Sequence, residues 1–296
     1  MKQNPIYRRE TMVSARSFRL ALIPMIFNGI LALVALLNLY STLGQVKLTA
    51  EIQYSNFMNL YMFVAVLEFV MVVLLMPALT AGSISGERER RTLELMLTTK
   101  MTPADIIFGK LAASLSTMVL LIVSSFPVLA MMFIYGGVTV RDMGLLLLCY
   151  MVAALLVGSI GICCSAVFKK TMVATVASYG VLGILVLGTC LANQLVLYLQ
   201  QWGGDAWLVS AGQNGTAADS GHFLYLLLVN PTTTFFLTML RMAGQEQGGG
   251  LFSRLFGNHS LESIHNTWVA GSIVIQLVMA GVFLWMAVRA LERKKR

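Results

Sequence analysis

Residues 80–110 decide the fold, and they read TAGSISGERERRTLELMLTTKMTPADIIFGK. The whole chain has 21 Lys and Arg residues and 13 Asp and Glu residues, and nine of these charges lie within this one stretch. Long apolar runs lie on both sides of it. A charged, helix-forming segment between two membrane spans offers a binding surface to a partner outside the bilayer.

The composition excludes a soluble protein. Of the 296 residues, 57% are hydrophobic and 11% are charged, whereas soluble domains carry about 25% charged residues. Several apolar runs exceed the roughly 18 residues that indicate a transmembrane helix. No small-residue cleavage site follows the first run, so we expect it to be retained as a span. We therefore predict an all-α polytopic membrane protein that forms one transmembrane domain over residues 1–296.

Six transmembrane helices are predicted, at 21–43, 57–81, 106–135, 143–168, 171–199 and 268–288. Residues 1–20 form a basic, mildly amphipathic segment, which either lies along the membrane surface or remains a solvated tail. Residues 82–105 connect the second span to the third, and residues 200–267 form an outer region. The third span begins with Thr102 as its N-cap, followed by Pro103 and Asp105, a variant of the capping box.

The basic residues predict the orientation in the membrane. If the spans alternate from a cytoplasmic N-terminus, 17 of the 21 Lys and Arg residues lie inside. Only Lys47, Arg141, Arg241 and Arg254 lie outside. We therefore expect both chain ends and residues 82–105 in the cytoplasm. This one-sided distribution explains the net charge of +8 without a nucleic-acid partner.

An apolar segment at residues 222–242 is interrupted by Asn230 and Pro231. A full span there would place the basic C-terminal cluster outside, so we predict a re-entrant or interfacial outer segment between spans five and six. The alternative is a seventh span.

Motifs for chemistry are absent from the sequence. There is no His-Glu-x-x-His pattern, and the four cysteines show no Cys-x-x-Cys spacing. Gly109 and Lys110 resemble the end of a phosphate-binding loop. However, Ala104 replaces the required first glycine, and Leu111 replaces the Ser or Thr. We expect no catalytic residue, cofactor or metal in this chain.

Glu68 is the one acidic residue deep within a predicted span. A charged carboxyl there costs about 2.5–3.5 kcal/mol on insertion scales. It is either part of a translocation path or a carboxyl that is hydrogen-bonded across a helix interface. On the first alternative, the protein could be a secondary transporter that uses Glu68 as its coupling group. A membrane assembly factor without transport activity is a further alternative.

The charged stretch itself predicts a short helix over residues 87–98. Two i,i+4 ion pairs and one apolar face are expected: Glu87 with Arg91, Arg90 with Glu94, and Leu93 with Met96 and Leu97. On the fourth span, small residues recur at helical spacing: Ala154, Gly158, Gly161 and Ser165. This stripe predicts close helix packing.

Residues 84–99, followed by Thr102-Pro103, Ile106-Ile107 and Gly109-Lys110, resemble the signature of type-2 ABC transporter permeases. The six-span layout extends the likeness over the chain, and residues 230–235 are similar to the family's outer proline-containing segment. The outer region at 200–267 is long, which departs from the pattern.

The resemblance implies a non-enzymatic permease subunit of an ABC exporter in the bacterial cell membrane. It would pair with a second permease copy, identical or not, and with a cytoplasmic ATP-binding cassette subunit that binds the ATP. In this family the helix between spans two and three docks on the ATPase and couples its closure to a change of access. The contact residues carried over are Glu87, Arg88, Glu89, Arg90, Arg91, Thr92, Leu93, Glu94 and Leu97.

Overall fold

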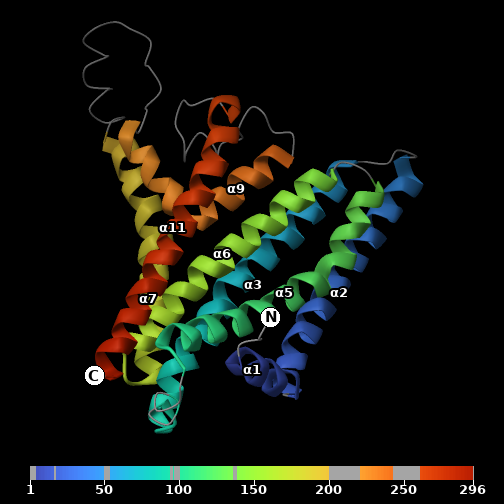
Figure 1. Cartoon of the computed structure of the whole chain (residues 1–296). Helices are drawn as coiled ribbons and strands as arrows, with labels where there is room; N and C mark the ends of the chain where they lie inside the picture. The colour runs from blue at the N-terminus through green and yellow to red at the C-terminus, as the bar shows by residue number, and fades with distance from the viewer. Residues whose placement is uncertain are drawn as a thin grey trace, which may run out of the picture. The chain divides into compact units, whose positions relative to one another are not determined.

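The structure is a computed structural model, and it describes residues 5–16, 18–49, 54–93, 96, 101–135, 139–199, 221–242 and 261–295. The described residues are almost all helical and contain no strand (Figure 1). The longer helices are α1 (Pro5–Arg16), α2 (Phe18–Thr49), α3 (Tyr54–Glu89), α5 (Pro103–Tyr135), α6 (Val140–Val167), α7 (Thr171–Gly183) and α11 (Leu261–Lys295). A π-helix, η1 (Ile184–Gly188), continues α7, and a 3₁₀ helix, η2 (Gly221–Val229), precedes α9 (Pro231–Met242).

Six helical segments are long and apolar enough to cross a membrane: Pro24–Ser41, Tyr61–Glu89, Pro103–Pro127, Val140–Val167, Thr171–Leu199 and Trp268–Arg293. They fall at the six predicted spans. The prediction of an all-α protein with six transmembrane helices is thereby confirmed.

The chain forms two compact units, one of Met1–Ser178 with Ala280–Arg296 and one of Tyr179–Met279. In the first unit, α3 packs along α6 and α5, and α1 packs against α5.

The small-residue stripe of α6 makes its close contact with α3. A Cβ atom at Gly161 would overlap the side chain of Thr80, and one at Gly158 would overlap the side chain of Met76. One turn further on, the Ser165 hydroxyl accepts hydrogen bonds from two backbone N–H groups of α3, each at 2.9 Å. The predicted packing role of the stripe is confirmed, because only small residues let two helix backbones approach so closely.

Five helices and the α3–α5 connection meet in one apolar cluster of the first unit, which we call the terminal core. Its buried members are Ile6, Ile84, Leu93, Ile106, Ile107, Leu111, Ile162, Ala166, Leu284, Ala287 and Leu291. They come from α1, from the α3–α5 region, from the end of α6 and from the end of α11. Helix α1 and the C-terminal end of α11 therefore lie at the same end of this unit, as Figure 1 shows.

Capping boxes stabilise the N-termini of two helices, α5 and α6. At α5, the Thr102 hydroxyl accepts from Asp105 N at 3.2 Å, and Asp105 Oδ2 accepts from Thr102 N at 3.2 Å, as predicted. Thr139 and Asp142 form a second box at the start of α6. Each box satisfies two backbone donors of the first turn.

The second unit contains the predicted break at Asn230. Its side-chain Oδ1 accepts from Thr232 N at 2.9 Å, which caps α9, and Pro231 occupies the first helical position. The Asn230 Nδ2 donates to Val186 O at 3.1 Å and to Thr189 Oγ1 at 2.9 Å. The helices on either side of the break have 9 and 12 residues, and each is too short to cross a bilayer, which takes about 20 residues.

Buried polar side chains hold this break against α11. Ser272 Oγ donates to the Leu228 carbonyl at 2.7 Å, and Gln276 Nε2 donates to Thr234 Oγ1 at 2.8 Å. Because the chain leaves the helical pattern at Asn230, the Leu228 carbonyl needs such a side-chain donor. The predicted break is confirmed, and its placement at the outer membrane face stays a prediction.

Candidate functional site

The sequence predicts a separate helix that begins at residue 87, and this prediction is wrong. Helix α3 continues to Glu89, and a left-handed Arg91 (φ 56°) then ends it. Thr92 N donates to Glu87 O at 2.9 Å, and Arg91 N donates to Arg88 O at 3.0 Å. This pair of bonds is the Schellman pattern that closes a helix C-terminus. Helical structure resumes at Leu93.

Arg88 and Glu89 bind the connection between α6 and α7. The Arg88 guanidinium donates to Phe168 O at 2.7 Å and to Ala166 O at 3.0 Å, so it serves carbonyls at the end of α6. The Glu89 carboxylate accepts from Thr171 N at 2.9 Å and from Thr171 Oγ1 at 2.8 Å. An acid here also suits the positive end of the α7 dipole. Arg88 and Glu89, which were predicted to contact the ATP-binding subunit, thus form hydrogen bonds within the permease itself.

Glu87 pairs with Lys110, and the predicted ion pair with Arg91 is wrong. The Lys110 ammonium lies 2.9 Å from Glu87 Oε1 and 3.1 Å from Glu10 Oε1, and the lysine side chain is only 4% exposed. The left-handed turn removes Arg91 from the i+4 position on the helix, which explains the change of partner. Lys110 thereby joins α1, α3 and α5.

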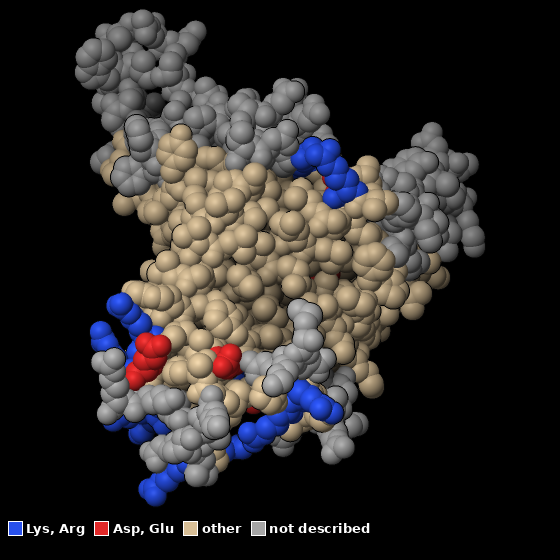
Figure 2. Space-filling model, viewed as in Figure 1, with Lys and Arg blue, Asp and Glu red and all other residues tan. Residues whose placement is uncertain are grey.

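Three successive side chains after α3 are exposed: Arg90, Arg91 and Thr92. Leu93 is buried in the terminal core. Glu94 and Leu97 lie outside the described residues, and so does the predicted ion pair of Arg90 with Glu94. Figure 2 shows Lys and Arg side chains gathered at this end of the first unit.

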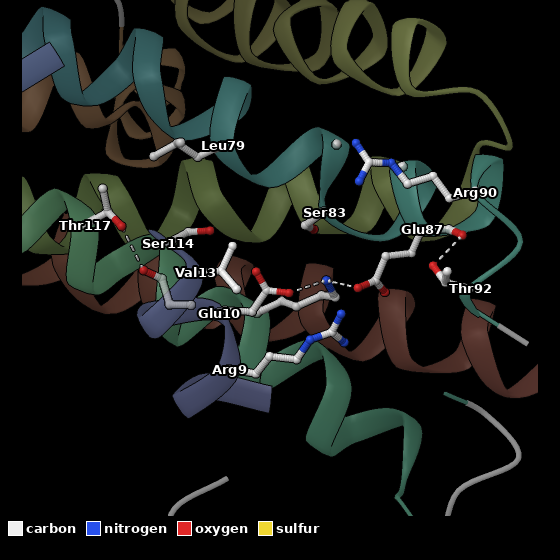
Figure 3. Close-up of a pocket in the computed structure, with 14 residues that line it drawn as sticks. Arg9, Glu10, Val13, Leu79, Ser83, Glu87, Arg90, Thr92, Ser114 and Thr117 are labelled. Carbon is white, nitrogen blue, oxygen red and sulfur yellow. Dashed lines mark hydrogen bonds and ion pairs between the residues drawn. The ribbon is translucent and has the colours of Figure 1, made fainter. Parts of the chain in front are cut away.

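A cavity of about 440 Å³ opens beside the turn. It is bordered by α1, α3 and α5, and its charged lining residues are Arg9, Glu10, Glu87, Arg90 and Lys110 (Figure 3). Hydroxyl groups of Ser83, Thr92, Ser114 and Thr117 complete its polar surface. Within the described ranges, no three His, Cys, Asp or Glu side chains come close enough to hold a metal ion.

Glu10 is the member of this site that the sequence did not reveal. It is the only acidic residue among the first twenty, which was the available signal. Its partner Lys110 lies 100 residues further along the chain, so no local spacing rule could join the two.

Glu68 is fully buried in the first unit. Its Oε1 accepts a hydrogen bond from Ser125 Oγ at 2.5 Å, and Tyr150 on α6 is a second polar neighbour. The Tyr150 hydroxyl donates to Ala65 O at 2.8 Å. The structure therefore contains the hydrogen bond across a helix interface that one of the two alternatives requires. The place of Glu68 on a translocation path stays a prediction.

The family model described as ABC-2 family transporter protein matches residues 28–289, which is most of the chain. The chain belongs to the ABC-2 family. A search of curated protein sequences finds no significant match. The family resemblance that residues 84–110 indicated is confirmed, and with six apolar helices the chain is a multi-pass membrane permease of an ABC transporter. Such a permease is a transmembrane subunit and is not itself catalytic.

Proposed function

We propose that this ABC-2 permease is the transmembrane subunit of an ATP-driven exporter in a bacterial cell membrane. Both chain ends and the α3–α5 connection would face the cytoplasm. Two observations support this orientation. The terminal core brings α1, the connection and the end of α11 together, and 17 of the 21 basic residues would fall on that side if the spans alternate.

The exposed turn after α3 is the proposed docking surface for a separate ATP-binding cassette subunit. The observation that carries this proposal is a difference between neighbouring residues: some are exposed to solvent, and others are bound to the rest of the permease. Arg90, Arg91 and Thr92 are exposed, whereas Glu87, Arg88 and Glu89 are bound to other segments of the permease. Glu94 and Leu97 would extend the surface. The exposed, charged turn is thus anchored to the rest of the permease by the three residues that precede it.

Force applied to this turn has three routes into the membrane spans. It reaches α5 through the Glu87–Lys110 ion pair, and it reaches the end of α6 through Arg88. Leu93 passes it into the terminal core. ATP would bind to the partner subunit, whose closure moves the turn and switches access between the two membrane faces. A second permease copy would complete the pathway.

Charge reversal tests the docking surface. We expect the double variant Arg90→Glu with Arg91→Glu to insert normally but to lose at least tenfold of the ATP-binding subunit that co-purifies in mild detergent. Removing one side of a close interfacial charge pair costs about 2–5 kcal/mol, which is ample for this loss.

The matched control is the double variant Lys169→Glu with Lys170→Glu, which makes the same charge change in the α6–α7 connection. It should retain more of the subunit than the Arg90 and Arg91 variant. Unchanged co-purification after reversal at Arg90 and Arg91 would refute the docking surface. If no ATP-binding subunit co-purifies with the unmodified chain, the rival classes, a secondary transporter or an assembly factor, would be favoured.

A further inference from the structure

The cavity between α1, α3 and α5 is lined by basic side chains that do not take part in its ion pairs. Lys110 is paired with both Glu10 and Glu87. Arg9 and Arg90 line the same cavity, and neither forms an ion pair within the part of the chain that the structure describes. Figure 3 shows the two arginines on opposite sides of Glu87, Arg9 on α1 and Arg90 at the end of α3. Two guanidinium groups are therefore available to an anion.

Glu87, which lines the same cavity, also has an unfilled hydrogen-bond acceptor. Glu87 Oε1 receives the Lys110 ammonium at 2.9 Å, but the second carboxylate oxygen, Oε2, is buried and has no hydrogen-bond partner among the described residues. A buried acceptor without a donor costs about 1–3 kcal/mol. A ligand that brings an N–H donor to this oxygen would remove that cost.

From the length of α3, we infer that the cavity lies at the level of the lipid headgroups. The candidate span in α3 begins at Tyr61, and a bilayer core needs about 20 helical residues. The α3 residues that line the cavity run from Leu79 to Arg90. If the hydrocarbon core begins at Tyr61, these residues extend from its edge into the headgroup layer. Val13 of α1, which is 61% exposed, adds an apolar contact at the rim.

We propose that this cavity binds the headgroup of a phosphatidylethanolamine-type lipid. Its phosphate would lie against Arg9 or Arg90, because a guanidinium group binds phosphate oxygens with two hydrogen bonds. Its primary ammonium would donate to Oε2 of Glu87. A cavity of about 440 Å³ falls within the usual range for small-molecule sites.

The two halves of this headgroup explain the selectivity. A phosphatidylglycerol headgroup satisfies the arginines but brings no cation to Glu87. A phosphatidylcholine headgroup carries a quaternary ammonium, which has no N–H to donate. Only a primary ammonium linked to a phosphodiester meets both the free arginines and the free carboxylate oxygen. The site requires no ATP-binding subunit, but it shares Arg90 and Thr92 with the proposed docking surface, so its test relies on Arg9 and Ser114, which lie outside that surface.

Native mass spectrometry of the purified, delipidated permease tests the proposal. The protein is titrated in turn with phosphatidylethanolamine, phosphatidylglycerol and phosphatidylcholine of identical acyl chains. We expect phosphatidylethanolamine to bind at least fivefold more tightly than either of the others. The variant Glu87→Gln should bring the affinities for phosphatidylethanolamine and phosphatidylglycerol close to each other.

Two variants change the cavity and leave the turn after α3 unchanged. Arg9→Gln removes one guanidinium, and Ser114→Phe fills the cavity without a change of charge. Each should weaken phosphatidylethanolamine binding at least fivefold. The matched control is Arg8→Gln, which makes the same charge change at the neighbouring exposed residue outside the cavity lining and should bind as the unmodified protein does.

Equal binding of the three lipids, or equal losses in Arg8→Gln and Arg9→Gln, would overturn the proposal. Displacement of the lipid by inorganic phosphate at equal concentration would identify a free-anion site and would overturn the assignment to a lipid. Thermal unfolding of each variant in the same detergent identifies any that fail to fold. If Arg9→Gln is one of these, Ser114→Phe decides the outcome.

Discussion

A single side chain, Lys110, holds three helices of the first unit together. Its ammonium is nearly buried and is neutralised by Glu10 of α1 and Glu87 of α3. A buried charge is tolerated only when it is paired in this way. Motion of either carboxylate must therefore carry Lys110, and with it the start of α5, or break an ion pair. This makes the residue a direct link between the turn after α3 and the third span.

Glu68→Gln tests the role of the buried carboxyl. The amide oxygen of glutamine can still accept the bond from Ser125, so we expect normal assembly with the ATP-binding subunit. We also expect the reconstituted complex to keep at least about a third of its ATP-driven transport. By contrast, Glu68→Ala removes the acceptor, and should lower stability by about 1–3 kcal/mol. Complete loss of transport by a normally assembled Glu68→Gln complex would instead make Glu68 a coupling residue.

For individual residues, the sequence predicted which charged side chains belong to the site but not which partners they bind. Glu87 was expected to bind Arg91 four residues away, whereas it binds Lys110, 23 residues away. Glycine usually occupies the left-handed position of a Schellman turn, and arginine there gives no sequence signal. Partners that are set by tertiary contacts, such as Glu10 with Lys110, have no local pattern to reveal them.

Helix α3 joins the apolar candidate span to the turn after it as one continuous helix. Its 36 residues correspond to a length of about 54 Å. The polar sequence Gly86 to Glu89 remains helical because Arg88, Glu89 and Glu87 find partners on α6, α7 and α5. A displacement at the turn therefore acts on the whole span, and α6 follows it where the two helices touch closely.

Gly161→Val tests that close contact. The new side chain would overlap Thr80 of α3, so we expect a loss of about 1–3 kcal/mol in stability, as for other overpacked sites. The matched control is Gly144→Val in the same helix, where an added Cβ meets nothing within 4 Å. Thermal unfolding in detergent measures both. Equal shifts for the two variants would show that α3 and α6 do not pack through this stripe.

Hydrophobic runs predicted the existence and order of the spans, but not where α3 ends. The predicted second span ended at residue 81, whereas α3 ends at Glu89. Hydropathy reports the edge of the apolar stretch, and a helix can continue beyond that edge into water. The break at Asn230 was predictable because proline cannot continue a helix. The π-helix at Ile184–Gly188 has no comparable marker in an apolar run.

For the molecule as a whole, the terminal core supports an even number of membrane crossings. Ile6 of α1 and Leu291 of α11 belong to the same apolar cluster, so α1 and the end of α11 lie at the same end of the first unit, as an even number of crossings requires. The even number also agrees with the basic residues, which gather near both ends and in the α3–α5 connection. The proposed cytoplasmic location of this side can be tested directly.

Cysteine labelling in intact cells distinguishes the two sides. We expect a membrane-impermeant maleimide to modify Asn214→Cys, in the outer region outside the described residues, without permeabilisation. It should modify Thr92→Cys, in the exposed turn, only after the membrane is opened. The reverse pattern would invert the orientation, and labelling of both sites in intact cells would contradict the six-span topology.

The central claim is that the turn after α3 contacts an ATP-binding cassette subunit, and cross-linking tests it most directly. In a background with the four native cysteines replaced by alanine, Thr92→Cys is treated in membranes with a short bifunctional reagent. Val140→Cys, exposed at the opposite end of α6 from the terminal core, is the control. We predict a cross-link to the ATP-binding subunit from Thr92→Cys and none from Val140→Cys. A cross-link from Val140→Cys without one from Thr92→Cys would contradict the account.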